Sequence, residues 1–248
     1  MGKKIETIQD LFLDENGKIR DKEEILKDVE TIVDGIESYE NMDKMYIESF
    51  LPEDSLICDP DEVIISHSFL SREIYIVGEI NAEMGVAIPN QIRFWNKADD
   101  ADGIPVEERA PIKVYIDTPG GDMSATFAMI DSIKNSKTPV YTITTGEGCS
   151  GGFFVGICGH KRFGYKHSSY LFHEGSCSFG ADAHKYGQHY KFYAKRLNQI
   201  KDITLENTKF TEKFYNIHKK DDLWLTADEA LKFGVIDEIV NGGTTDAE

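Results

Sequence analysis

Residues 114–122, with the sequence VYIDTPGGD, carry the pattern that decides the fold class. The apolar run that opens this segment is typical of a β-strand, and the Pro-Gly-Gly sequence after it predicts a tight turn. A helix is expected directly afterwards, over residues 123–133. Paired glycines leave backbone N–H groups open beside the start of that helix, which is a favourable place for an anion. A tight turn without any ligand explains the same sequence equally well.

The alternation of strand and helix extends on both sides of this segment. An apolar run at residues 74–77 predicts a buried strand, followed by a helix over 82–96 and a polar surface loop over 97–111. A further strand is expected at 140–143, before a glycine-rich turn and a helix of small residues that starts at Ser150. Short connections between alternating strands and helices predict an α/β domain with a largely parallel sheet.

The C-terminal part of the chain changes character after residue 173. A long polar and aromatic helix is expected over residues 182–207. Four apolar residues are expected to form its buried side: Phe192, Leu197, Ile200 and Ile203. The segment 226–229 is a capping box that opens a short helix, and Gly234 ends that helix before a strand over 235–240. Residues 242–248 have the composition of a frayed tail.

The first 60 residues differ from the rest and predict an acidic, mostly helical extension. Between residues 25 and 36, apolar side chains recur at helical spacing with acidic side chains between them. Such a stripe is typical of a packing face, which would dock on the chain's own core, on a neighbouring subunit or on a partner. The predicted boundaries are therefore 1–60 for the extension, 61–241 for the main domain and 242–248 for the tail.

Composition excludes several functional classes. The chain has 248 residues, of which 27 are Lys or Arg and 44 are Asp or Glu, which gives a net charge of −17. This charge argues against binding to nucleic acid or to an anionic membrane. The four cysteines show no Cys-x-x-Cys spacing, which predicts reduced thiols without a structural metal. With no secretory signal and no apolar run of membrane-spanning length, the expected location is the cytoplasm.

Two further segments carry residue types that suit acyl-transfer chemistry. Ser150 lies in the glycine-rich sequence at 146–152, where a helix N-terminus favours developing negative charge. A helix-capping serine explains that segment more simply when it stands alone. His173 ends an apolar strand, and a serine hydroxyl needs such a base to become nucleophilic, although a structural histidine is the simpler explanation. These residues alone do not choose among the seven histidines.

In this order, the segments resemble the proteolytic subunit of the Clp protease, from about residue 74 to 240. The family's Ser-Pro-Gly-Gly turn matches residues 118–121, and its Gly-x-Ala-x-Ser nucleophile sequence matches 146–150. Its Met-Ile-His-Gln-Pro sequence matches 171–175, and its acid followed by an aromatic residue and a capping sequence matches 222–227. The separations of 23 residues from serine to histidine and 49 from histidine to aspartate also fit the family.

The resemblance implies a serine endopeptidase that needs no cofactor or metal. Its nucleophile, general base and orienting acid would be Ser150, His173 and Asp222. Asp221 adjoins the acid and stays open as the alternative. Backbone N–H groups of Gly121 and Gly151 would form the oxyanion hole. The implied fold is an α/β core of repeated β-β-α units, as in Clp peptidases and crotonases, with a protruding handle helix.

The resemblance also implies partners for the chain. Family members self-associate into one or two stacked rings, expected to be heptameric, around a chamber that admits unfolded proteins and peptides. An AAA+ unfoldase is the partner implied by the family, and capsid proteins are the substrates of its phage members. A non-catalytic scaffold is one alternative, and a crotonase-type acyl-CoA enzyme is another.

The chain departs from the family pattern in three places. Gly148, Cys149 and Gly151 replace the residues that usually flank the nucleophile, and Cys149 leaves a thiol nucleophile open. The family's Gln-Pro after the base is replaced by residues 174–175, Glu-Gly. The Asp-Arg pair that contributes to contacts between rings is replaced by residues 220–221, Lys-Asp.

Overall fold

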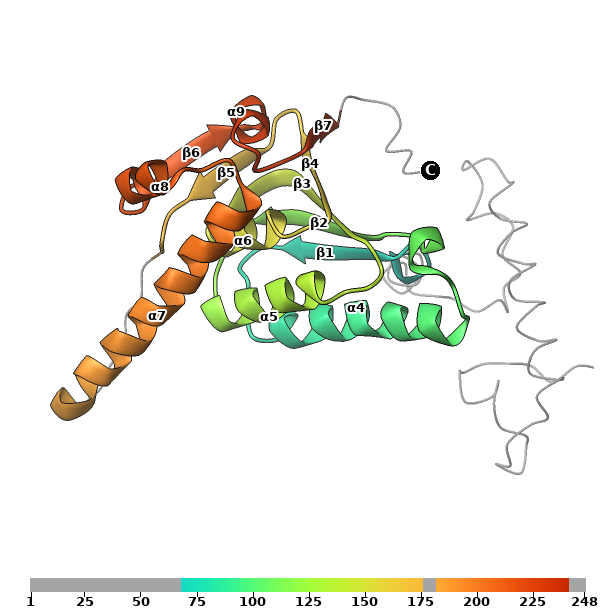
Figure 1. Cartoon of the computed structure of the whole chain (residues 1–248), viewed down its shortest axis with the longest axis horizontal. Coiled ribbons are helices and arrows are strands. Elements are labelled where there is room, and N and C mark those ends of the chain that lie inside the picture. Colours follow the sequence, from blue (N-terminus) through green and yellow to red (C-terminus); the bar gives the residue numbers. More distant parts are fainter. Residues whose placement is uncertain (1–67, 176–181, 241–248) are drawn as a thin grey trace, which may run out of the picture. The chain divides into compact units, whose positions relative to one another are not determined.

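A mixed sheet flanked by helices makes up the described part of the chain (Figure 1). The computed structural model describes residues 68–175 and 182–240. This architecture confirms the predicted α/β class with a largely parallel sheet. The predicted acidic helix of residues 1–60 and the predicted tail at 242–248 lie outside the described residues.

The sheet combines a parallel body with a small antiparallel extension. Parallel strands run in the order β1 (Glu73–Val77), β2 (Ile112–Thr118), β3 (Val140–Cys149), β4 (Lys161–Tyr165) and β7 (Glu238–Val240). Off this path, β5 (Ser169–Phe172) pairs in parallel with β3, and β6 (Leu223–Thr226) pairs antiparallel with β5. The helical elements are α4 (Met84–Ala101), η2 (Val106–Glu108), α5 (Met123–Lys134), α6 (Gly151–Gly156), α7 (Ala183–Asn207), α8 (Glu212–His218) and α9 (Ala227–Lys232).

Strand β3 changes partner along its length. Residues 141–144 pair with β4, and residues 147–149 pair with β5. The glycine-rich turn expected before Ser150 is therefore wrong, because these residues continue the strand. The Asp117 carboxylate accepts a hydrogen bond from the Glu147 N–H at 3.0 Å, and a side chain at Gly146 would collide with that carboxylate. Glycine here permits a close approach of two strands rather than a turn.

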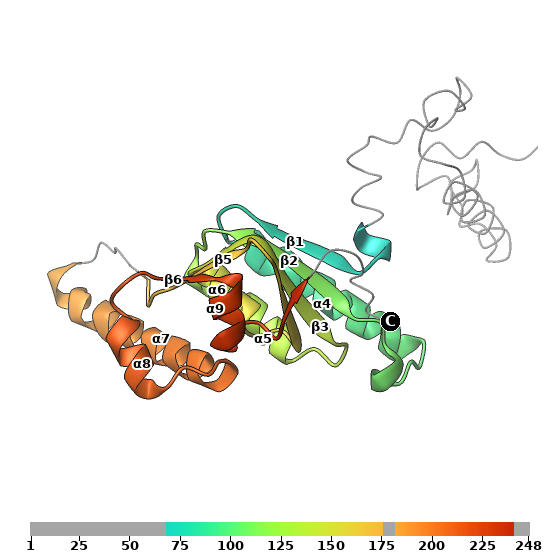
Figure 2. The same ribbon diagram turned by 90° about the horizontal axis from the view of Figure 1, so that it is seen from above.

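Helices α4 and α5 lie side by side along one face of the sheet (Figures 1 and 2). Strand β1 accordingly alternates: Ile74 and Ile76 are buried, whereas Tyr75 is 50% exposed and Val77 is 58% exposed. The prediction of a fully buried strand at 74–77 is thus wrong, since its second face is uncovered in the described structure. Tyr75 stacks there on Tyr115 of β2, with ring centroids 5.1 Å apart.

The predicted long helix is confirmed as α7, whose first turns project away from the sheet (Figure 1). Ile200 is buried against the body, and Leu197 and Ile203 are half-buried. Phe192 is 62% exposed, so its expected place on the buried side is wrong, because its neighbour Tyr193 is a half-buried side chain of that turn. Among the described helices, none is both long enough and apolar enough to cross a bilayer.

A buried ion pair joins the far end of α4 to the sheet. This helix continues past the expected end at residue 96, so that Asp99 is fully buried rather than in a surface loop. Arg72 donates two hydrogen bonds to its carboxylate, at 2.9 and 2.5 Å, and the Thr138 hydroxyl donates a third at 2.6 Å. A buried carboxylate is tolerated only when it is paired in this way, so these contacts fix the start of β1 against α4.

We predict that Asp99→Asn destabilises the fold by about 3 kcal/mol at neutral pH, because it removes the negative charge that the Arg72 guanidinium faces. The hydrogen bonds from Arg72, followed by that from Thr138, hold the pKa of the Asp99 carboxyl below its ordinary value. A carboxyl with a lowered pKa stabilises the fold above its unfolded-state pKa of about 4 and loses that contribution as the pH falls. Urea unfolding should therefore show a difference between wild type and variant that shrinks below about pH 4.

The matched control is Asp228→Asn, because Asp228 forms an exposed ion pair with Lys166 on the surface. Its effect should stay below about 1 kcal/mol. An equal effect of both substitutions would contradict a structural role for the buried pair.

Candidate active site

The sequence-predicted site residues lie at one edge of the sheet. Ser150 directly follows β3, His173 directly follows β5, and Asp222 directly precedes β6. Gly121 follows β2 through the Pro-Gly-Gly turn. Because β2, β3 and β5 are parallel, their carboxyl ends meet at the same edge, which is where open α/β sheets bind ligands.

Ser150 occupies a sharp turn between strand and helix. Its backbone has φ 51° and ψ −114°, a conformation that non-glycine residues rarely adopt. The turn is held by the Ser150 N–H, which donates to the Leu171 carbonyl at 2.9 Å, and by the Phe154 N–H, which donates to the Ser150 carbonyl at 3.2 Å. The Ser150 side chain makes no capping hydrogen bond, so the simpler explanation of a helix-capping serine is not realised.

Glycines allow the neighbouring chain segments to approach Ser150 closely. A β-carbon at Gly120, which has φ +99°, would lie 2.7 Å from Ser150 Cβ and 2.8 Å from Gly151 N. A β-carbon at Gly152 would lie 2.3 Å from Thr118 Cγ2. The Pro-Gly-Gly turn and the start of α6 therefore pack backbone against backbone beside the serine.

Two backbone N–H groups are open beside this serine. Gly151 is the first residue of α6, so the helix offers no acceptor for its N–H. Within the described ranges, neither the Gly151 N–H nor the Gly121 N–H donates a hydrogen bond. A β-carbon built on Gly151 would lie 3.5 Å from the Gly121 nitrogen, which places the two groups next to each other.

The imidazole of His173 faces the carboxylate of Asp222. The antiparallel register pairs Phe172 with Leu223, so His173 and Asp222 form the next position outward. His173 Nδ1 lies 3.3 Å from Asp222 Oδ1, and His173 Nε2 is buried without a hydrogen-bond partner in the described part of the chain. Asp221, the sequence alternative, instead belongs to the end of α8, where its N–H donates to the His218 carbonyl at 3.1 Å.

A cavity of about 460 Å³ joins these groups. Ser150, His173, Gly121 and Gly151 line it together. Apolar side chains of three helices complete much of its wall: Met123, Phe154 and Ile200. The serine, the imidazole and both open N–H groups therefore share one solvent-accessible space.

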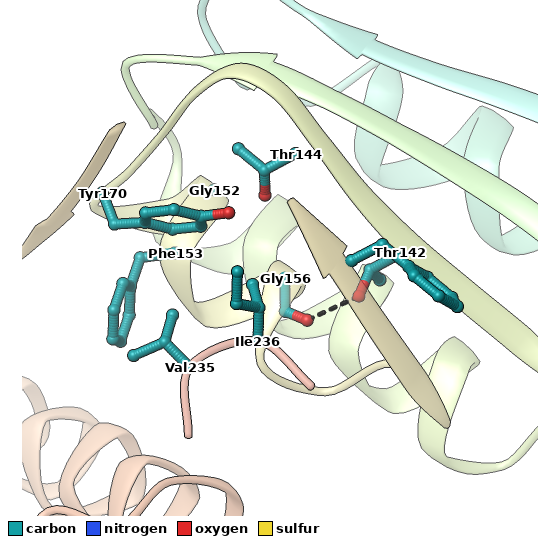
Figure 3. Close-up of a pocket in the computed structure, with 9 residues that line it drawn as sticks. Thr142, Thr144, Gly152, Phe153, Gly156, Tyr170, Val235 and Ile236 are labelled. Atoms are coloured by element: carbon teal, nitrogen blue, oxygen red, sulfur yellow. Dashed lines mark hydrogen bonds between the residues drawn. The ribbon is translucent and has the colours of Figure 1, made fainter. Parts of the chain in front are cut away.

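Packing on the far side of α6 supports the serine turn. The Thr142 hydroxyl donates to the Gly156 carbonyl at 2.7 Å, and the aromatic ring of Tyr170 packs beside Phe153 and Ile236 (Figure 3). Tyr170 is almost fully buried, with its hydroxyl 3.0 Å from that of Ser168. This packed region holds α6 in place from behind and leaves its N-terminus facing the cavity.

Cys149, the neighbour of the serine, points into the protein. Its side chain is 2% exposed and does not line the cavity. Burial, with a smaller contribution from the Glu147 carboxylate, raises the pKa of the Cys149 thiol to about 12. Since only a thiolate is an effective nucleophile, the structure argues against the thiol alternative.

Contacts from α8 next to the imidazole were not anticipated from the sequence. The Tyr215 hydroxyl donates to Glu174 Oε1 at 2.9 Å, and Glu174 lines the cavity. The only sequence signal was that residue 174 departs from the family pattern. A strand at 223–226 and a helix at 212–218 were not predicted, so nothing indicated that these residues meet.

The amino-acid sequence of the chain is similar to that of known Clp proteases. The family model described as Clp protease matches residues 61–243. The chain is 32% identical over 181 residues to the ATP-dependent Clp protease proteolytic subunit 2 of Treponema denticola, covering 72% of this chain and 86% of that protein. It is 30% identical over 182 residues to the protein of the same name from Treponema pallidum, covering 72% of this chain and 87% of that protein. The chain is 28% identical over 182 residues to the ATP-dependent Clp protease proteolytic subunit of Streptococcus suis, covering 72% of this chain and 89% of that protein.

We predict that Gly152→Ala destabilises the protein by roughly 1–3 kcal/mol, because its methyl group collides with Thr118 Cγ2. Adding Thr118→Ser removes that methyl group and keeps the hydroxyl, which should restore most of the lost stability. Thermal unfolding of the two single variants and the double variant measures this coupling. Gly187→Ala is the control, because outside the helix's own backbone no atom of the described residues lies within 4 Å of the added methyl group, and the helix should gain slight stability.

Proposed function

The chain belongs to the Clp protease family, and we propose that it is a serine endopeptidase with Ser150 as nucleophile, His173 as general base and Asp222 as orienting acid. The observation that carries this proposal is the approach of His173 Nδ1 to Asp222 Oδ1, 3.3 Å, at the wall of the cavity that Ser150 also lines. A carboxylate on Nδ1 leaves Nε2 to accept a proton, which is the tautomer that a general base requires.

The proposed reaction is acyl transfer to water. The Ser150 hydroxyl oxygen bonds to the carbonyl carbon of the peptide while His173 Nε2 takes the hydroxyl proton. The C–N bond then breaks, and the imidazolium returns the proton to the leaving amine. A water molecule repeats the two steps on the acyl-enzyme and releases the new carboxyl group with free Ser150.

Backbone groups supply the proposed stabilisation of the tetrahedral intermediate. The open N–H groups of Gly121 and Gly151 would donate to its oxyanion, and loss of one such donor costs roughly 3 kcal/mol in other enzymes. The hydroxyl of Ser150 and His173 Nε2 are not yet hydrogen-bonded to each other. Catalytic hydrogen bonds often shorten only when substrate is bound, so this geometry is compatible with the proposed roles.

Proposed partners follow from the same family. We propose self-association into heptameric rings that enclose the cavities, with an AAA+ unfoldase delivering unfolded chains. The names of the Treponema and Streptococcus relatives, which describe subunits of an ATP-dependent protease, support that partner. Exposed aromatic side chains on the projecting part of α7, Tyr190 and Phe192, support assembly between subunits.

We predict that Ser150→Ala abolishes hydrolysis of a fluorogenic peptide and labelling by a fluorophosphonate. Asp222→Asn should lower kcat by about 10³-fold or more, because the imidazole loses the group that fixes its tautomer. Asp221→Asn is the matched control and should keep kcat within about threefold, since Asp222 and not Asp221 pairs with His173. Cys149→Ser should also keep activity. A larger loss of kcat in Asp221→Asn than in Asp222→Asn would indicate that Asp221 is the acid. Peptide hydrolysis by the Ser150→Ala variant would contradict the serine mechanism.

We predict that native mass spectrometry of the full chain detects a ring-sized oligomer. Phe192→Glu should reduce the oligomer, because it removes an exposed aromatic surface and adds charge. Gln188→Glu adds the same charge one helical turn earlier without removing apolar surface, and it should change assembly less. A monomeric wild-type chain would contradict the ring, and rings without peptide turnover would favour a scaffold.

A further inference from the structure

We infer that Glu174 is a positioning residue that holds His173 and Asp222 in register for the reaction. It does so by connecting the segment after β5 to the loop between α8 and β6. This inference rests on the proposed serine mechanism and adds a residue to which that mechanism assigns no role. Glu174 and its partners Tyr215 and Lys219 together form the Glu174 clamp.

The Glu174 clamp has three contacts. The Glu174 backbone N–H donates to the Lys219 carbonyl at 3.1 Å. The Tyr215 hydroxyl donates to Glu174 Oε1 at 2.9 Å, and Lys219 Nζ lies 3.9 Å from the same oxygen. Glu174 adjoins His173 in the chain, and Lys219 lies three positions before Asp222, so the clamp joins the two segments that carry the imidazole and the carboxylate.

The His173–Asp222 contact needs a second attachment because it lies beyond the end of the ladder. The pairing of β5 with β6 stops at Phe172 and Leu223, one position before this contact. The side chain of Asp222 is 64% exposed, and His173 is its only ion-pair partner among the described residues. An exposed carboxylate with a single ion-pair partner moves readily. The β5–β6 ladder holds the two segments together before this contact, and the Glu174 clamp holds them together after it.

The Tyr215 hydroxyl donates a hydrogen bond to this clamp from a buried position. Its side chain is fully buried, and its ring lies 5.3 Å from that of Phe172, the residue before His173. Burial, followed by the hydrogen bond to Glu174, raises the pKa of the Tyr215 hydroxyl well above its ordinary value. The hydroxyl therefore stays protonated throughout the physiological range and keeps donating to the carboxylate. The side chain of Glu174 is 17% exposed, which shields that hydrogen bond from water.

The contacts also separate a hydrogen-bonding role from an ionic one. A glutamine at this position keeps the carbonyl oxygen that accepts from Tyr215 and the backbone N–H that donates to Lys219. It loses only the ion pair with Lys219 Nζ, which at 3.9 Å and with partial exposure contributes little. The clamp should therefore survive Glu174→Gln and fail in Glu174→Ala.

The test measures kcat and KM for a fluorogenic peptide with the full-length, assembled chain. We expect Glu174→Ala to lower kcat about tenfold or more with KM within about twofold, because the substrate still binds but the base is misplaced. Tyr215→Phe keeps the packed ring and should lower kcat in the same direction. Glu174→Gln should restore kcat to within about threefold of wild type. Glu206→Ala is the control, because Glu206 is an exposed carboxylate that pairs with Lys134 of α5 and does not line the cavity.

Several outcomes would overturn the inference. Wild-type kcat in Glu174→Ala would do so, and so would an equal loss in Glu174→Gln, or a raised KM at unchanged kcat, which would indicate a substrate contact instead. A loss that parallels partial unfolding of both Glu174 variants at the assay temperature would also count against it. Measuring Ser150→Ala in the same series separates a failure of the clamp from a failure of the serine mechanism. If that variant is inactive while Glu174→Ala is normal, only the clamp fails; if it stays active, the serine mechanism fails with it.

Discussion

The candidate site depends on the parallel pairing between the last residues of β3 and the short strand β5. Cys149 lies opposite Leu171, and the same ladder continues through the hydrogen bond from the Ser150 N–H to the Leu171 carbonyl at 2.9 Å. This pairing ends both strands at one edge. A shift of register by one residue would move the imidazole along the strand and turn its side chain to the other face.

Much of the fold was predictable because its signals are local. The strand at 114–116, the helices near 123 and 182, and the turn at 118–121 follow from periodicity and glycine placement. The short strand β6 and the helix α8 were missed because each has few residues and gains its stability from neighbours distant in sequence. The strand at 146–149 was mistaken for a turn, since its glycines serve a close approach to Asp117 that no local pattern reveals.

The site was predictable in part, and for two different reasons. Ser150 and His173 carry chemistry in their local sequences, although the choice of this histidine depended on the family resemblance. The choice between Asp221 and Asp222 depends on the antiparallel register of β5 and β6, which connects residues about fifty positions apart. For Glu174 the sequence showed only a departure from the family pattern and no role, because its partners come from an unpredicted helix and the residue that follows it.

The uncovered face of the sheet has a consequence for the behaviour of the chain in solution. Strand β1 is an edge among the described strands, and it presents Tyr75 and Val77 outward beside the ring of Tyr115. An aromatic edge of this kind invites unwanted strand pairing between molecules. The net charge of −17 opposes such encounters by mutual repulsion. The acidity of the chain thus opposes non-specific association at an apolar surface that the described residues leave uncovered.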